Sequence, residues 1–241
     1  RFTVNTVGPV SYQWQWLSSS GNWININTES AKTDTLLVTG KASRNNLQYR
    51  CVVTGSRGTV YSDTATLKIK PKITKQPVSV TAAAESTVRF KITATGADLT
   101  YQWQWRKSGG SWTDVNTAAA STATLPVTAY ARRNNLQYRC LVISDNGMVC
   151  SSAATLKVKP AITKQPVDLT TTVGGTATFK VTAAGVNLSY QWQWRKSGGS
   201  WTNVETAAAK TASLPVTGKV TRNNLQYRCK VTGTNGTVYS S

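Results

Sequence analysis

The ionisable side chains of this chain offer little for catalysis. Histidine is absent from all 241 residues, which removes the usual proton shuttle and both the Ser-His and the Cys-His nucleophile pairs. The 9 acidic residues are scattered, with no Asp-x-Asp run for calcium, and no two cysteines have the spacing of a zinc site. We therefore expect a protein that is not an enzyme and that uses no cofactor and no metal.

Glutamine, arginine and tryptophan are the candidates for binding. The run Tyr101-Gln-Trp-Gln-Trp105 alternates, and a strand with this period points Trp103 inward and both glutamines outward. The later strand that carries Arg139 has the same period, so its arginine is expected on the same outward face. The pattern predicts a flat, polar, basic sheet face with edge tryptophans. Its candidate residues are Gln102, Gln104, Arg106, Lys107, Trp112, Arg139, Arg195, Lys196, Trp201 and Arg228.

Other interpretations of these residues stay open. The outward face is equally a solvated surface with incidental charge. Trp112 and Trp201, which follow Gly-rich turns near an edge, are equally structural residues. A second basic cluster, Arg132-Arg133, has only single arginines at the corresponding places of the chain, Arg44 and Arg222.

The same motifs recur with a strict period. Tyr12, Tyr101 and Tyr190 each open the run Tyr-Gln-Trp-Gln-Trp and lie 89 residues apart. The motif Asn-Asn-Leu-Gln-Tyr-Arg-Cys recurs at the same interval. A period of this length is too long for a solenoid repeat and close to the ~100 residues of a complete β-sandwich. Each repeat is therefore expected to be a domain.

The boundaries follow from the repeated junctions. Pro71-Lys-Ile-Thr-Lys-Gln-Pro77 recurs in nearly the same form from residue 160. We divide the chain into residues 1–70, 71–159 and 160–241, with the first strand of the first domain and the last strand of the third missing, as in a piece of a longer array. Two prolines and no Gly/Ser spacer at each junction predict a stiff connection and an elongated rod.

Positive charge is spread over all three repeats. The net charge is +19, and the repeats hold 8, 11 and 9 basic residues against 3, 4 and 2 acidic ones. A field of this sign attracts polyanions. Anionic cell-wall polymers, acidic glycans and nucleic acid are the candidate partners, and nucleic acid is the weakest of these because no aromatic–basic recognition motif is present.

The complete middle repeat shows only strand patterns. Val88, Phe90 and Ile92 alternate with polar residues, and so do the tryptophans after Tyr101. Asp145-Asn-Gly147 is a hairpin turn. About seven strands and no convincing helix result, so the fold class is all-β.

These residues resemble the immunoglobulin fold, and the whole chain is similar to the tandem bacterial immunoglobulin-like domains of Gram-positive surface proteins. A core Trp on the third strand and a downstream Tyr-x-Cys at fixed spacing carry the resemblance. It implies tandem β-sandwiches whose cores hold Trp14, Trp103, Trp192, Tyr49, Tyr138, Tyr227, Cys51, Cys140 and Cys229.

The chain departs from that pattern in its cysteines. The position that would pair with the core cysteine holds Val4, Ile92 or Val181, so the usual disulfide between the two sheets is absent. A bond between Cys140 and Cys150 stays open: a two-residue turn would put them on opposite faces, whereas a five-residue loop would place them opposite each other.

Three functions are considered for such a chain: a binding module, a structural spacer and, as the weakest, nonspecific nucleic-acid binding. The resemblance implies an extracellular location, on a bacterial surface or secreted, and a role as adhesin or binding module or as stalk. As a binding module, it would hold a host glycoprotein, an immunoglobulin, a glycan or an anionic cell-wall polymer. As a spacer, it would have no ligand. No specific nucleic acid and no membrane span are expected.

Overall fold

The structure is a computed structural model that describes residues 1–241. Its contacts group the chain into two compact units: residues 1–75, 93–101 and 141–150 form one, and residues 76–92, 102–140 and 151–241 form the other. The chain is all-β, and its only helices are six short 3₁₀ segments. None is long and apolar enough to cross a membrane.

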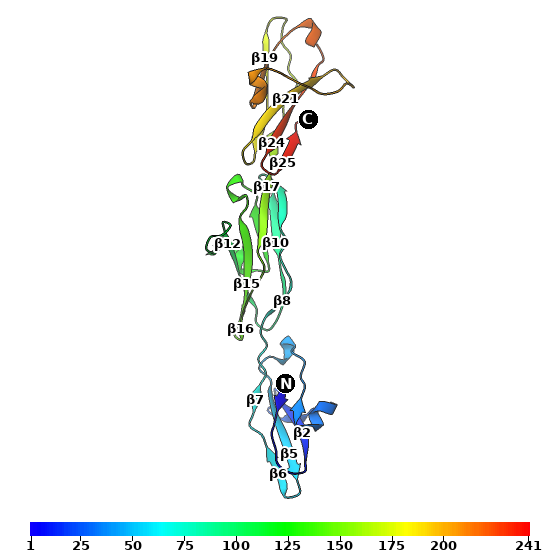
Figure 1. Cartoon of the computed structure of the whole chain (residues 1–241), viewed down its shortest axis with the longest axis vertical. Helices are drawn as coiled ribbons and strands as arrows, with labels where there is room; N and C mark the ends of the chain where they lie inside the picture. The colour runs from blue at the N-terminus through cyan, green and yellow to red at the C-terminus, as the bar shows by residue number, and fades with distance from the viewer. The chain divides into compact units, whose positions relative to one another are not determined.

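In the first repeat, a five-stranded antiparallel sheet has the order β3-β2-β5-β6, and its fifth strand, β7, also pairs with β5. A two-stranded sheet, β1-β4, forms the second layer. These strands are β1 (Phe2–Thr3), β2 (Val10–Leu17), β3 (Trp23–Asn25), β4 (Thr35–Leu36), β5 (Gln48–Gly55), β6 (Gly58–Tyr61) and β7 (Ala65–Thr66). Figure 1 shows β2, β5 and β6 side by side.

In the second repeat, the main sheet has the order β13-β12-β15-β17-β9, and β16 pairs with β15. Two further pairs, β10-β14 and β8-β11, complete its strands. The bounds are β8 (Lys72–Lys75), β9 (Val80–Ala83), β10 (Thr87–Lys91), β11 (Thr93–Thr95), β12 (Thr100–Arg106), β13 (Thr113–Asp114), β14 (Thr124–Thr128), β15 (Gln137–Ser144), β16 (Gly147–Cys150) and β17 (Ala154–Lys159). The parallel pair β9-β17 fits an immunoglobulin-like sandwich, in which the first strand crosses to the edge of the sheet that carries the last.

The third repeat follows the same plan up to its end. Its main sheet has the order β22-β21-β24-β25. Two separate two-stranded sheets, β18-β20 and β19-β23, complete its strands. The bounds are β18 (Ala161–Lys164), β19 (Thr176–Lys180), β20 (Thr182–Ala184), β21 (Ser189–Arg195), β22 (Thr202–Asn203), β23 (Ser213–Thr217), β24 (Gln226–Gly233) and β25 (Gly236–Tyr239).

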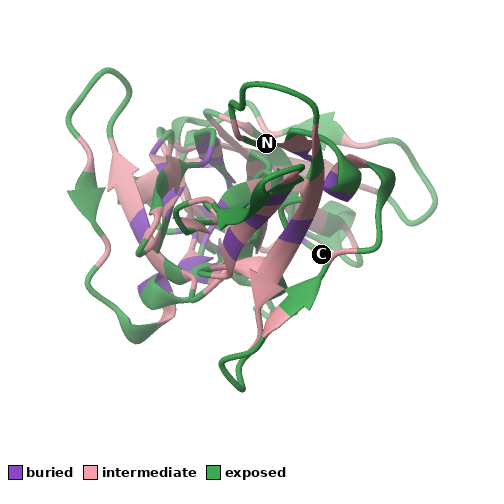
Figure 2. Cartoon of the chain, turned by 90° about the horizontal axis from the view of Figure 1, so that it is seen from below, coloured by how far each residue is buried: buried purple, intermediate pink, exposed green.

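Alternation along the strands builds each core. The central tryptophans Trp14, Trp103 and Trp192 are at most 3% exposed. Each donates its indole N–H to a backbone carbonyl 2.9–3.0 Å away, so the polar atom of the ring is satisfied inside the sandwich. In the first and third repeats the tryptophan is directly opposite the buried cysteine on the neighbouring strand: Trp14 faces Cys51 and Trp192 faces Cys229. In Figure 2 the buried positions lie on strands and on some of the short 3₁₀ segments, whereas the outer loops are exposed.

The second and third repeats each contain a stacked aromatic pair that joins the two layers of the sandwich. The rings of Phe90 and Tyr138 lie 4.9 Å apart, and those of Phe179 and Tyr227 lie at the same distance. Burial raises the pKa of the Tyr138 hydroxyl, and nearby Arg133 opposes the shift. Tyr138 is buried, and Tyr227 is half-buried and packs against the buried core of the third repeat.

The hairpin that joins β15 and β16 decides the question of the disulfide. Ser144 pairs with Gly147, so the turn has two residues, and Cys150 pairs with Leu141. Cys140 therefore points into the core, whereas Cys150 is exposed on the other face. Because adjacent residues of a strand point to opposite faces, this register excludes a bond between Cys140 and Cys150.

Candidate functional site

The outward face of each main sheet carries a row of stacked arginine and aromatic side chains. We call this row the arginine–aromatic ladder. Its members are Trp23, Arg50 and Tyr61 in the first repeat, Arg106, Trp112 and Arg139 in the second, and Arg195, Trp201, Arg228 and Tyr239 in the third.

The ladder of the third repeat has the most members. The guanidinium carbon of Arg195 lies 4.4 Å from the centroid of the Trp201 ring, and that of Arg228 lies 4.2 Å from the same ring. Arg228 also contacts Tyr239 at 4.4 Å. These distances fall within the range of cation–π attraction, which holds each guanidinium flat against a ring.

The ladders of the other two repeats are shorter. In the second, Arg106 and Arg139 lie 4.4 and 4.3 Å from the Trp112 ring. In the first, Arg50 lies between Trp23 and Tyr61, at 4.2 and 4.4 Å. Leu17 stands in β2 where the other repeats have Arg106 or Arg195, so the first repeat has one cation in its ladder instead of two.

Glutamine side chains fix the arginines in place. The Nε of Arg139 donates to Oε1 of Gln104 at 2.8 Å, and Nε2 of Gln104 donates to Oδ1 of Asp114 at the same distance. The equivalent pairs are Arg50 with Gln15 and Arg228 with Gln193, both at 2.9 Å. Strand register explains the pairing, because Gln15 lies directly opposite Arg50 and Gln193 opposite Arg228.

The guanidinium ends remain open. Each ladder arginine uses its Nε for a hydrogen bond and the plane of its guanidinium for stacking on a ring. None of these arginines forms a hydrogen bond within the chain through its two Nη atoms. The side chains are half-buried. A guanidinium held in this way presents a planar fork of N–H donors that matches the two oxygens of a carboxylate or phosphate.

The residues predicted from the sequence do not all join this site. Gln104, Arg106, Trp112, Arg139, Arg195, Trp201 and Arg228 come together in the ladders. Gln102 lies apart from them, because its Nε2 donates to the backbone carbonyls of Trp103 and Val115 and ties β12 to the segment after β13. Lys107 and Lys196 are exposed in the turns that follow Arg106 and Arg195.

Several residues in or beside the ladders were not singled out from the sequence. Gln137 and Gln226 accept hydrogen bonds from the Nε of Arg106 and Arg195, at 2.8 and 2.7 Å. Tyr61 and Tyr239 end their ladders, and Cys150 occupies the corresponding place in the second repeat. The signal that could have found the glutamines is the alternation Gln-Tyr-Arg, which puts Gln137 two residues before Arg139 and so on the same face.

Arg132 and Arg133 form a separate cluster. Their guanidinium carbons lie 4.4 and 5.3 Å from the centroid of the Tyr130 ring, and Arg133 donates to the carbonyl of Thr128. The other repeats have lysine where Tyr130 stands, so this stack occurs once in the chain.

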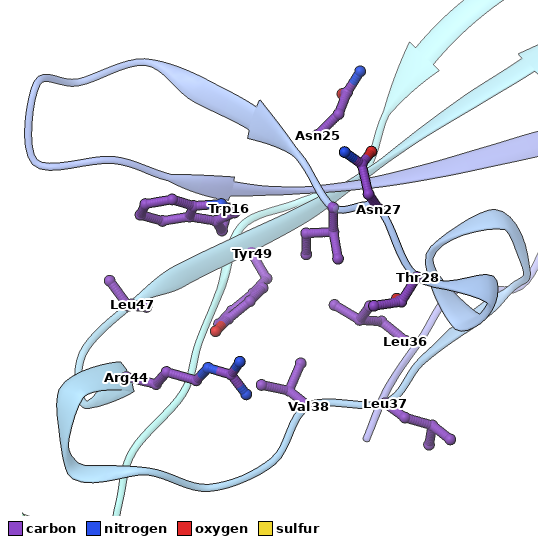
Figure 3. A pocket seen from close by; sticks show the side chains of 11 residues that line it. Trp16, Asn25, Asn27, Thr28, Leu36, Leu37, Val38, Arg44, Leu47 and Tyr49 are labelled. Carbon is purple, nitrogen blue, oxygen red and sulfur yellow. The ribbon is translucent and has the colours of Figure 1, made fainter.

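A hollow of about 440 Å³ opens at the edge of the first sandwich (Figure 3). Trp16, Leu47 and Tyr49 line one side, Leu36 and Val38 the other. The side chain of Arg44 reaches across the rim, and its Nη1 donates to the carbonyl of Thr39. With no acid among its lining residues, the hollow offers shape and one cation but no acid–base pair.

No group of three His, Cys, Asp or Glu residues in the structure is placed to hold a metal ion. The buried thiols are poor nucleophiles, because burial raises the pKa of Cys140 to about 12 and that of Cys229 to about 11.

The curated proteins that resemble this chain match only part of it. No family model matches the chain. Over 172 residues, or 69% of the chain, it is 36% identical to Endoglucanase C of Cellulomonas fimi, of which the match spans 15%. It is 28% identical over 146 residues to mouse leucine-rich repeats and immunoglobulin-like domains protein 3, covering 54% of the chain and 13% of that protein. The chain thus spans less than a fifth of the curated relatives it matches.

Among solved structures, the I-band fragment I67–I69 of titin aligns with 99% of the chain and 88% of its own length, at 17% identity and a TM-score of 0.42. The N-terminal four immunoglobulin domains of Dscam1 isoform 4.44 align with 95% of the chain and 64% of their length, at 16% identity and a TM-score of 0.38.

Proposed function

We propose that the chain is a non-enzymatic, extracellular binding region of a bacterial protein, and that its arginine–aromatic ladders hold an anionic polysaccharide. The observation that carries this is the open guanidinium fork, fixed by a glutamine at Nε and by a ring against its face, in every repeat. Such a fork is preorganised, so binding costs less side-chain entropy than it would for a mobile lysine.

The chemistry of the ladder suits a sugar polymer with acidic groups. Its forks would bind carboxylate or phosphate oxygens, and the apolar edges of Trp112 and Trp201 would contact sugar rings next to them. The net charge of +19 would draw a polyanion to all three repeats. The similarity to part of Endoglucanase C supports a place beside, rather than within, a carbohydrate-active domain.

Replacing the central ladder arginine of each repeat by lysine tests this proposal. Arg50→Lys, Arg139→Lys and Arg228→Lys together keep the net charge but remove the planar fork. We expect the affinity of the full chain for a uronic-acid polymer, measured by calorimetry, to fall by about tenfold or more. A second arm with a phosphate-bearing wall polymer distinguishes the two sources of acidic groups.

The matched control removes charge elsewhere. Lys70→Gln, Lys91→Gln and Lys180→Gln change three exposed lysines outside the ladders and lower the net charge by three. If this control weakens binding more than the arginine-to-lysine variant does, the ladders are not the site and the binding is general electrostatic attraction. If the unchanged chain binds neither polymer, the repeats act as a spacer and the proposal fails.

A further inference from the structure

The ladder of the second repeat lacks a ring that the ladder of the first repeat has. In the first repeat, the guanidinium carbon of Arg50 lies 4.2 Å from the centroid of the Trp23 ring and 4.4 Å from that of the Tyr61 ring. In the second repeat, Arg139 contacts one ring alone, that of Trp112, at 4.3 Å. A planar guanidinium has two faces on which a ring can stack, so one face of Arg139 carries no ring.

The third repeat shows that the second ring is a general feature of the ladder. Arg228 lies 4.2 Å from the centroid of the Trp201 ring and 4.4 Å from that of the Tyr239 ring. These distances equal those in the first repeat. The ladder geometry therefore accepts a tyrosine ring at a fixed place beside its central arginine.

In the second repeat, Cys150 stands where the others have this tyrosine. Strand register gives the equivalence: Cys150 lies opposite Leu141, as Tyr61 lies opposite Val52, and the third repeat has the same register. The residue opposite follows the central arginine by two positions, so it belongs to the same outward face. A thiol is much smaller than a phenol ring and leaves the place of that ring open.

The turn end of the same hairpin is apolar in the second repeat alone. Ile143 and Met148 lie opposite each other and are 37% and 59% exposed. In the first repeat, Thr54 and Thr59 stand there, and their hydroxyls share a hydrogen bond of 3.1 Å. Two threonines make the same bond in the third repeat. Exposed apolar side chains at this end of the face favour a ligand with an apolar body.

The guanidinium of Arg139 is held in place before any ligand arrives. Its Nε donates to Oε1 of Gln104 at 2.8 Å, and Gln104 is fixed in turn by a bond of 2.8 Å to Oδ1 of Asp114. The ring of Trp112 supports one face. A ligand that stacks on the other face therefore does not have to order a mobile side chain.

We propose that the open face of Arg139 binds a tyrosine side chain from an acidic segment of a partner protein. The ring takes the place that Tyr61 and Tyr239 occupy in their own ladders, which is why a tyrosine is the expected group. Carboxylates next to it bind the open Nη atoms of Arg106 and Arg139, and the net charge of +19 favours such a segment. The inference uses the geometry of the ladder and does not require the polysaccharide.

A short peptide tests this proposal on the full 241-residue chain. The peptide is Asp-Gly-Tyr-Gly-Asp, blocked at both ends, and nuclear magnetic resonance of the arginine Nε–H groups follows its binding. A ring that stacks on a guanidinium shifts the resonance of that group. We expect a saturable shift at Arg139 and much smaller shifts at Arg50 and Arg228, because two rings already stack on each of those arginines.

The matched peptide has leucine in place of tyrosine. It has the same charge, so general electrostatic attraction acts equally on both peptides. We expect the leucine peptide to bind about threefold more weakly or worse, because it cannot make the cation–π contact with Arg139.

A substitution in the chain tests the same place. Cys150→Tyr supplies the missing ring from within the chain, as in the other two repeats. It should shift the Nε–H resonance of Arg139 before any peptide is added and should prevent the shift caused by the tyrosine peptide. Cys150→Ser keeps a small side chain at this position and should bind the peptide as the unchanged chain does. Circular dichroism of both variants verifies that they are folded.

The proposal is overturned if the leucine peptide binds equally well, if Cys150→Tyr binds the tyrosine peptide as the unchanged chain does, or if no resonance shifts. Equal shifts at Arg50, Arg139 and Arg228 would overturn it as well. Cys150→Tyr keeps every ladder arginine, so it should leave the affinity for the uronic-acid polymer unchanged. The polysaccharide experiment can therefore fail while the peptide binds, and the reverse also holds.

Discussion

The nine tryptophans have different environments, although they come from one repeated sequence. Trp103 and its equivalents are buried, and each satisfies its N–H within the sandwich. Trp112 and Trp201 are half-buried, and two guanidinium groups stack on each of their rings. The first kind supplies apolar burial, and the second supplies a flat, electron-rich face.

The cysteines give a test at the scale of the residue. Iodoacetamide reacts with the thiolate, and burial both blocks access to Cys51, Cys140 and Cys229 and raises their pKa, to about 12 for Cys140 and about 11 for Cys229. At pH 8 these groups therefore stay protonated. We expect native chain to be alkylated at Cys150 alone.

Mass spectrometry of tryptic peptides measures this labelling. In denaturant all four thiols should react, which provides the control. Rapid labelling of Cys140 in the native chain would show that the second sandwich is not closed around it. A failure of Cys150 to react would show that its side chain does not face solvent.

At the scale of the element, each ladder depends on three pieces of chain. In the second repeat, β12 supplies Gln104 and Arg106, β15 supplies Gln137 and Arg139, and the segment before β13 supplies Trp112. The short turn before Trp112 brings that ring over the two strands. The positions of the arginines thus follow from strand register, and register in turn depends on the hairpins.

The hairpin of β15 and β16 gives a test of this dependence. Gly147 has φ 133°, a conformation that an L-residue rarely adopts, and nothing lies within 4 Å of the place of an added Cβ. Gly147→Ala should therefore destabilise the chain by backbone strain alone, by about 1 kcal/mol or more. Thermal unfolding followed by circular dichroism measures it.

Gly40→Ala is the matched control. Gly40 does not have a positive φ, and an added Cβ would meet Ile69 at an ordinary contact distance of 3.5 Å. This variant should be neutral or slightly stabilising. Equal destabilisation by both substitutions would contradict the strained turn.

At the scale of the whole molecule, the ladders form a graded set. The third repeat has two arginines and two rings, the second has two arginines and one ring, and the first has one arginine and two rings. All three repeats have more basic than acidic residues, so no single tail accounts for the net charge of +19.

Single replacements should reveal this order. We expect Arg228→Lys to weaken binding of a uronic-acid polymer most, Arg139→Lys less and Arg50→Lys least, because the third ladder stacks its arginines on more ring surface and the first has one cation. Titrations of the three variants at one salt concentration measure the order. Equal losses in the three variants would contradict this order. No loss in any variant would indicate that the ladders act only through their charge, which lysine keeps, and raising the salt should then abolish all binding.

Much of this protein follows from its sequence alone. The 89-residue period, the alternation around Trp103 and the Tyr-x-Cys motif identify all-β, immunoglobulin-like sandwiches, because strand period and core composition are local properties of the chain. The outward place of Gln104 and Arg139 follows from the same alternation. The absence of histidine limits the chemistry without any coordinates.

Only the tertiary structure joined the arginines to the tryptophans. Trp112 and Arg139 are far apart in sequence, and their stacking depends on which residues of two strands lie opposite each other. The same register separated Cys140 from Cys150, and the fold tied Gln102 to the backbone carbonyl of Val115, just after β13. Cross-strand register is set by turn length and by packing over the whole sandwich, so a pattern within one strand cannot specify it.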